Sequence, residues 1–260
     1  MNRVLVVDDE PDIVYMVKVI LRSAGFEVAA ASGVGDAIEQ LSGGDPDLIL
    51  LDLRLGDGEG WAVEEFTRLG THNTTHVDAP WHYNSKIGGE PAKTIDQLPL
   101  DWFFAPGVVL DFTSAGDGDA IRPDQIEAEL ARTGHELRER DIVLVKTGRD
   151  AFLDAPDYLI RGPGVTAAAT RWLFDRGVRV MGIDAWGWDA PLNLQAAEAL
   201  EREEPGIFWA AHQADLPYCQ IERLANLGAL PATGFQVACF PLKVVGGSAG
   251  PARVVAILAD

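Results

Sequence analysis

Two short apolar runs near the start of the chain alternate with segments that have helical spacing. The runs Arg3–Val7 and Leu48–Leu51 are each followed by an aspartate, and both are typical of buried parallel strands. Between them, Pro11 stands where a helix can begin, apolar residues recur at helical spacing, and Gly25 ends the pattern. The first 66 residues are therefore predicted to form a strand-helix-strand-helix-strand (βαβαβ) segment.

The later part of the chain alternates in the same way. Residues 123–132 and 165–175 have the pattern of helices, and residues 142–145 and 178–183 have the pattern of strands. Asp184 follows the last of these strands directly. The body of the chain is therefore expected to be α/β as well.

Carboxylates follow both apolar runs of the first segment. Asp8 and Asp9 come after the first run, and Asp52 comes after the second. The carboxyl ends of parallel strands line the functional crevice of an open α/β sheet, so these three side chains are expected to gather there. Three carboxylates in one pocket repel each other unless a cation joins them, and their hard oxygen atoms suit Mg²⁺.

Three of the five histidines fall within eleven residues: His72, His76 and His82, with Asp78 among them. Imidazole nitrogen and carboxylate oxygen are the usual ligands of zinc and similar ions. In an extended chain His76 and Asp78 would point to the same side, and Pro80 opposes a helix here. The alternative is a polar surface loop that happens to be rich in histidine. His135 follows a helical stretch and is expected to be exposed at a helix C-terminus.

The run from His72 to His82 resembles the His-x-Gly-Thr-His-x-Asp-Ala-Pro-x-His signature of the cyclase family of metal-dependent hydrolases, which includes kynurenine formamidases and isatin hydrolases. Thr74 stands where the signature has glycine. The resemblance covers about residues 69–260 and continues in five blocks, which are Thr94–Pro99, Asp141–Gly148, Gly182–Asp184, Glu222–Leu227 and Phe240–Lys243.

This resemblance implies a metal centre of one or two ions, Zn²⁺ or Mn²⁺, in a three-layer β/β/α swivelling-type fold. Its implied ligands are His72, His76, Asp78, His212 and Glu222, with the two carboxylates bridging. His82 is then the acid/base, and metal-activated water attacks the carbonyl of an amide or cyclic amide, as in an arylformamidase. The family also implies a homodimer or homotetramer.

Residues 1–66 resemble about half of a response-regulator receiver domain, which has a flavodoxin-like fold. Asp8 and Asp9 would hold Mg²⁺, and Asp52 would be the phosphoacceptor. After Gly60-Trp61 the chain passes into the hydrolase signature and lacks the later receiver strands with their hydroxyl and lysine. Residues 1–66 are therefore interpreted as a truncated receiver-like segment, and residues 67–260 as the hydrolase-like domain. A phosphorelay fusion and a catalytically impaired scaffold remain alternatives.

A serine-hydrolase motif is also present but lacks its context. Gly246–Gly250 fits Gly-x-Ser-x-Gly, yet Pro251 and an apolar run follow in place of a helix, and no histidine remains downstream. These glycines are therefore expected to form a turn between strands.

Composition limits the classes of partner. The formal net charge of −19 over 260 residues argues against nucleic acid, because phosphates would be repelled. The sequence contains neither an apolar run long enough to span a membrane nor a recognisable signal peptide. Cys219 and Cys239 are expected to be reduced, in a cytoplasmic protein.

Overall fold

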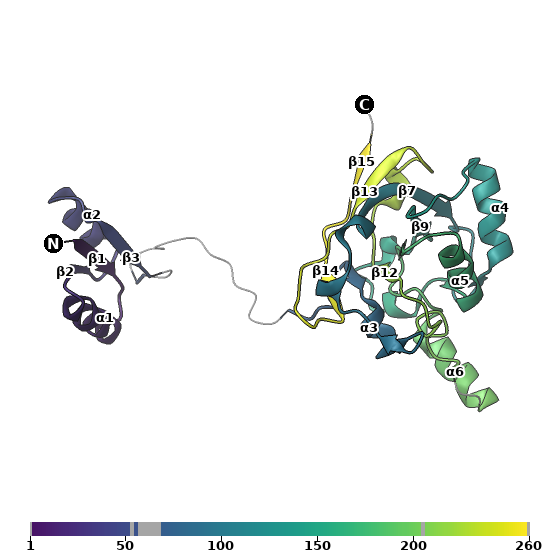
Figure 1. Cartoon of the computed structure of the whole chain (residues 1–260), viewed down its shortest axis with the longest axis horizontal. Helices are drawn as coiled ribbons and strands as arrows, with labels where there is room; N and C mark the ends of the chain where they lie inside the picture. Colours follow the sequence, from purple (N-terminus) through teal and green to yellow (C-terminus); the bar gives the residue numbers. More distant parts are fainter. Residues whose placement is uncertain (1, 53–54, 57–68, 204–205, 259–260) are drawn as a thin grey trace. The chain divides into compact units, whose positions relative to one another are not determined.

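The computed structural model of the protein describes residues 2–52, 55–56, 69–203 and 206–258. The chain divides into two compact units, residues 1–68 and residues 69–260 (Figure 1). Each unit has its own sheet and its own apolar core.

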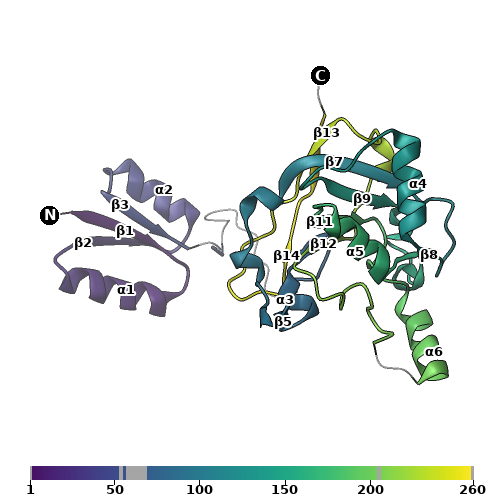
Figure 2. The ribbon, with the colours of Figure 1, turned by 45° about the vertical axis from the view of Figure 1, so that its right-hand side comes forward.

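The described part of the first unit is a parallel sheet of three strands in the order β2-β1-β3, with a helix on each face (Figure 2). Leu5 and Val7 of β1 pack beside α2, whereas the alternate residues Val4 and Val6 pack beside α1. The predicted βαβαβ order is confirmed. Its elements are β1 (Arg3–Val7), α1 (Pro11–Ser23), β2 (Glu27–Ala31), α2 (Val34–Ser42) and β3 (Leu48–Leu51).

The prediction that Leu48–Leu51 is a buried strand was wrong. These four side chains are 39 to 52% exposed. In the described residues β3 pairs only with β1 and so forms an edge of the sheet, and the helices pack on β1 and β2 instead. The apolar run correctly indicated a strand, but burial depends on neighbours that the run itself does not encode.

The described part of the second unit is built on a mixed sheet of eight strands in the order β14-β4-β12-β11-β9-β7-β13-β15. Strands β12, β11, β9 and β7 run parallel, and the outer strands pair antiparallel. The strands are β4 (His76–Asp78), β7 (Phe104–Asp111), β9 (Ile142–Lys146), β11 (Val180–Ile183), β12 (Cys219–Glu222), β13 (Phe235–Ala238), β14 (Ala249–Pro251) and β15 (Val255–Leu258). Two short pairs join β5 (Lys86–Ile87) to β6 (Glu90–Pro91) and β8 (Ala120–Ile121) to β10 (Gly164–Val165).

The sheet has a separate core on each face. Val143 and Val145 of β9 pack with α4 and α5, which cover one face in Figures 1 and 2. Ile142 and Leu144 point the other way and pack with residues of the outer strands β4 and β13. The α-helices are α3 (Pro80–Tyr83), α4 (Pro123–Thr133), α5 (Ala167–Asp175) and α6 (Leu192–Arg202), and the 3₁₀ turns are η1 (Ile95–Gln97), η2 (Leu100–Trp102), η3 (Arg149–Phe152), η4 (Tyr158–Ile160) and η5 (Leu227–Ala229).

The curled mixed sheet, with helices on one face and outer strands closing over the other, confirms the expected α/β fold. Among the described residues, no helix combines the length and apolar content needed to cross a membrane. Cys219 and Cys239 are buried and carry free thiols.

Candidate metal centre

Two neighbouring antiparallel strands position the centre of the site. In the register of β4 and β12, His76 lies directly opposite Glu222, and Asp78 lies opposite Gln220. Side chains two residues apart on a strand point to the same face, so His76 and Asp78 point together, as the sequence predicted. The pairing places the Glu222 carboxylate on that same face.

The ligand atoms of these residues lie close together. The Oδ1 of Asp78 lies 3.3 Å from Nε2 of His76 and 2.9 Å from Nδ1 of His72, which precedes β4. The Nε2 of His76 lies 3.6 Å from Oε2 of Glu222. Two sets of possible metal-ligand atoms share Asp78: one adds His72 and His82, and the other adds His76 and Glu222.

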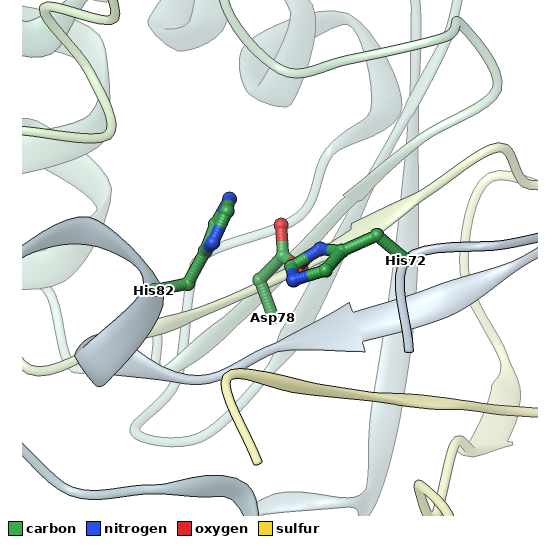
Figure 3. Close-up of side chains that lie close together, drawn as sticks. All are labelled: His72, Asp78 and His82. Carbon is green, nitrogen blue, oxygen red and sulfur yellow. Dashed lines mark ion pairs between the residues drawn. The ribbon is translucent and has the colours of Figure 1, made fainter. Parts of the chain in front are cut away.

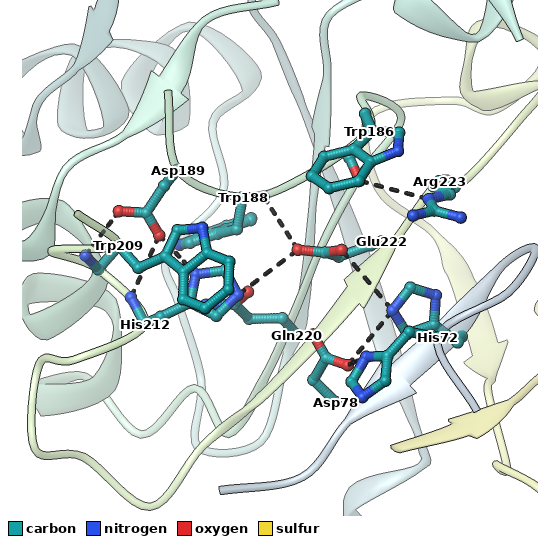
Figure 4. Close-up of polar contacts among 12 residues, drawn as sticks. His72, Asp78, Trp186, Trp188, Asp189, Trp209, His212, Gln220, Glu222 and Arg223 are labelled. Atoms are coloured by element: carbon teal, nitrogen blue, oxygen red, sulfur yellow. Dashed lines mark hydrogen bonds and ion pairs between the residues drawn. The ribbon is translucent and has the colours of Figure 1, made fainter. Parts of the chain in front are cut away.

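His212 reaches the same cluster from a distant part of the chain. Its Nε2 lies 3.6 Å from Oε1 of Glu222, and its Nδ1 lies 2.6 Å from Oδ2 of Asp189 (Figure 4). All five residues that the resemblance implied as ligands are therefore joined by a continuous series of contacts.

His82 lies beside the cluster on the short helix α3. Its ring centroid is 4.2 Å from that of His72 and 5.7 Å from that of His212. Figure 3 shows the rings of His82 and His72 on either side of the Asp78 carboxylate. Pro80 was expected to oppose a helix, but it occupies the first turn of α3, where its missing amide proton does no harm.

Burial and charge shift the pKa values of this cluster. Burial raises the pKa of Glu222 to about 7, and the charge of Asp78 adds to that shift. Burial also opposes ionisation of Asp78, but contact with His72 and His76 outweighs it and holds the pKa of Asp78 well below its usual range. Burial lowers the pKa of His82 to about 4.

The pKa values of the two histidines that face the carboxylates are raised, in contrast to that of His82. Burial favours neutral imidazoles, but Asp78 raises the pKa of His76 and Asp189 raises the pKa of His212 above their ordinary values. The site therefore stabilises positive charge between its two buried carboxylates.

Three buried polar atoms at the centre have no hydrogen bond to any described residue. These are Nε2 of His76 and both carboxylate oxygens of Asp78, whose short contacts with the histidines lack hydrogen-bond geometry. Buried polar atoms almost always have partners, because an unpaired one destabilises the fold. The nitrogen and oxygen donors fit a divalent ion such as Zn²⁺ or Mn²⁺.

A cavity of about 720 Å³, part of it open to solvent, lies over the cluster. His72, His82, His212 and Glu222 line one part of it, and the rest is lined by tryptophan and arginine side chains together with Asp189, Gln195 and several apolar residues. The ring of Trp209 stacks on His212 with centroids 5.4 Å apart. Trp188, which also lines the cavity, is fully buried and donates its indole N–H to Thr170.

Asp189 is a site residue that the sequence analysis missed. Asp184 also follows β11, but its carboxylate accepts hydrogen bonds from Thr147 and Gly148 away from the cluster. Asp189 has no distinctive spacing relative to the histidine-rich run. A useful signal was its position soon after strand β11, where an α/β sheet tends to place functional groups.

Three other residues that the sequence singled out have surroundings that it did not specify. Ser248, in the rejected serine-hydrolase motif, lies 2.9 Å from Nε2 of His72 and so supports a predicted ligand. His135 is not simply exposed at a helix end, because its Nε2 lies 2.7 Å from the buried carboxylate of Asp141. Thr74, which replaces the signature glycine, has a φ of 58°, a left-handed conformation that disfavours a β-branched residue.

The first unit brings together its own predicted residues. Asp8, Asp9 and Asp52 offer oxygen atoms that all lie within 4.8 Å of one another. This is the gathering expected at the carboxyl ends of β1 and β3. Phosphorylation of Asp52 and binding of Mg²⁺ stay predictions.

Comparison with known proteins identifies relatives of this chain. Residues 23–190 match the family model described as "Putative cyclase". A kynurenine formamidase of Salinibacter ruber is 31% identical over 191 residues, covering 72% of this chain and 76% of the relative. An isatin hydrolase of Roseibium aggregatum is 31% identical over 201 residues, covering 73% of each.

A solved structure of isatin hydrolase A from Labrenzia aggregata superposes with a TM-score of 0.65 and 27% identity, over 80% of this chain and 82% of that one. The chain is also similar to response regulators, over a shorter alignment; the MtrA protein of Mycolicibacterium smegmatis is 42% identical over 177 residues, covering 67% of this chain and 68% of the relative. Because the family model matches well over half of the chain and the formamidase aligns with most of it, the chain belongs to the cyclase family.

Proposed function

We propose that residues 69–260 form a metal-dependent hydrolase of an amide or cyclic amide. The observation that carries this proposal is the group of buried ligand atoms on His76 and Asp78 that make no hydrogen bond within the described residues. The relatives named as kynurenine formamidase and isatin hydrolase support the class of substrate.

The residues that would hold one or two ions of Zn²⁺ or Mn²⁺ are His72, His76, Asp78, His212 and Glu222. The chemistry that such an ion supplies is a lowered pKa of bound water and polarisation of a carbonyl group. Asp78 and Glu222 supply the negative charge that attracts a cation, and their burial protects that charge from screening.

His82 is proposed as the acid/base. Its half-buried ring lines the cavity beside His72 and His212, where it can reach a substrate and exchange a proton. It would accept a proton from the attacking water and donate one to the leaving nitrogen. The ring of Trp209 beside it offers a flat apolar surface for an aromatic substrate.

Metal analysis of the purified protein tests this proposal. We expect close to one or two equivalents of zinc or manganese per chain and a large loss of that metal in His76→Ala. His135→Ala is the matched control, because His135 pairs with Asp141 outside the site. Equal metal content in both variants would contradict the assignment.

Hydrolysis assays then separate an active enzyme from a scaffold. N-formylkynurenine and isatin represent an open amide and a cyclic amide, and turnover of either by the metal-loaded protein supports the proposal. A metal-loaded protein that hydrolyses neither would favour the scaffold alternative. Labelling with acetyl phosphate, compared between the wild type and Asp52→Asn, tests the phosphorelay alternative separately.

A further inference from the structure

Two arginines line the cavity over the metal centre, and they differ in how their charge is balanced. The guanidinium of Arg161 lies 2.6 Å from Asp157 and 3.7 Å from Asp117. Arg223 forms no ion pair with any carboxylate in the described part of the chain. Arg223 is therefore an unneutralised cation in the wall of the cavity, in a chain whose net charge is −19.

The carboxylates nearest in the cavity are already engaged. Glu222, the neighbour of Arg223 in sequence, faces His76 and His212. Asp189 accepts from His212 and from the backbone N–H of Ala211. Neither balances Arg223, so its charge is available to a bound molecule.

The backbone and an aromatic ring hold Arg223 in place. Its N–H donates to Ala185, its carbonyl oxygen accepts from the Thr75 hydroxyl at 2.6 Å, and its φ is 58°. The guanidinium lies 4.9 Å from the centroid of Trp186, and Nε donates to the Trp186 carbonyl (Figure 4). An arginine held on an aromatic ring keeps its charge and its remaining N–H donors while losing little further entropy when it binds an anion.

We infer that the substrate carries a carboxylate in addition to its scissile amide, and that Arg223 binds this carboxylate. The inference rests on the proposed function and narrows its substrate class to anionic amides. Trp186 and Trp209, which line the same cavity, would contact the body of such a substrate. Arg223 is then a binding residue that selects the substrate, and the metal centre and His82 act on the amide.

The test compares formanilide with its 2-, 3- and 4-carboxylated derivatives as substrates of the metal-loaded full-length protein. We expect the best carboxylated isomer to have a kcat/KM at least about tenfold above that of formanilide, the scale of one charge-assisted hydrogen-bonded pair. In Arg223→Gln this ratio should fall about tenfold, mainly through KM, and Arg223→Lys should restore part of it.

Arg176→Gln is the matched control. It removes the same charge and a similar contact, since Arg176 stacks on Trp172 at 3.5 Å from the ring centroid and does not line this cavity. The selectivity ratio should not change in this variant. An unchanged ratio in Arg223→Gln, or equal turnover of all four compounds by the wild type, overturns the inference and leaves the proposed function standing. The inference is also overturned if Arg223→Gln changes only inhibition by the aminobenzoate products and leaves the selectivity between substrates unchanged.

A binding measurement keeps the inference testable if no formanilide is hydrolysed, a result that would count against the proposed function. Titration calorimetry would compare benzoate with neutral benzamide. Tighter binding of benzoate by at least about tenfold in the wild type, lost in Arg223→Gln and kept in Arg176→Gln, supports the inference. Equal binding of the two compounds by the wild type overturns it.

Discussion

The carboxylate of Asp189 holds the ring of His212 in one orientation. Its Oδ2 lies 2.6 Å from Nδ1 of His212, and its Oδ1 accepts the backbone N–H of Ala211 at 2.8 Å. With Nδ1 engaged in this way, Nε2 of His212 faces Glu222. A carboxylate behind a metal-binding histidine fixes its tautomer and increases its basicity.

Asp189→Ala should therefore weaken metal binding without unfolding the protein. We expect a loss of affinity of about 10- to 100-fold, measured by competition with a chromogenic chelator. Asp124→Ala, a change at an exposed carboxylate on α4, is the control. The positioning role is refuted if Asp189→Ala binds metal as tightly as the control.

His82→Asn should separate proton transfer from metal binding. Asparagine has a similar size but cannot act as acid/base, so kcat should fall by about 10²- to 10⁴-fold while metal content stays at the wild-type level. His76→Asn should instead lose metal. Since His82 forms one possible ligand set with His72 and Asp78, loss of metal in His82→Asn would make His82 a ligand.

The sequence alone predicted some residues of the candidate metal centre but not others. The period-two spacing of His76 and Asp78 was enough to place both on one face of a strand. Glu222 and His212 have no local pattern that distinguishes them from other polar residues, so only the family resemblance indicated them. Glu222 reaches the site because β12 pairs with β4, and His212 reaches it through its contacts with Asp189 and Glu222. No local pattern specifies these contacts between distant segments.

The elements of the fold were easier to predict than their environment. Residues 123–132 and 142–145 were expected as a helix and a strand, and they form most of α4 and β9. Leu48–Leu51 was also correctly expected as a strand, but its position at a sheet edge leaves it exposed. Periodicity reports local conformation, whereas burial depends on which elements pack alongside.

Thr74→Gly should stabilise the protein. Thr74 adopts a φ of 58°, which destabilises a residue with a Cβ by about 1–2 kcal/mol. Glycine removes this strain, but its greater freedom in the unfolded chain offsets part of the stabilisation. We expect the free energy of unfolding to rise by about 0.5–1 kcal/mol in urea titrations. Thr74→Ala removes the hydroxyl but keeps the Cβ, so it should give no such gain; equal stability of the two variants would rule out backbone strain as the cause.

Glu129→Gln should make stability less dependent on acid pH. Hydrogen bonds from Arg132 lower the pKa of Glu129, which also accepts the backbone N–H of Asp111. A lowered pKa means that Glu129 stabilises the fold above its unfolded pKa and loses this contribution as the pH falls through the folded value. The variant should be about 1 kcal/mol less stable at pH 7. The loss is no larger because Arg132 is largely exposed and solvent screens the pair, and the difference should shrink towards pH 3. Glu127→Gln, at an exposed position on the same helix, is the control; a difference that stays constant with pH would contradict the role of ionised Glu129.

Deletion of residues 1–68 should leave the second unit folded. Its two apolar cores consist of residues beyond position 76, and every strand of its large sheet pairs within the unit. We therefore expect residues 69–260 to unfold cooperatively, with a midpoint within about 4 °C of the corresponding transition in the full chain, as followed by circular dichroism. A larger fall would mean that the first unit packs on the second and stabilises it, because loss of an interface lowers the midpoint in proportion to the free energy removed. Metal content of the same fragment then shows whether the five proposed ligands need the first unit, and full retention would confine the proposed metal centre to residues 69–260.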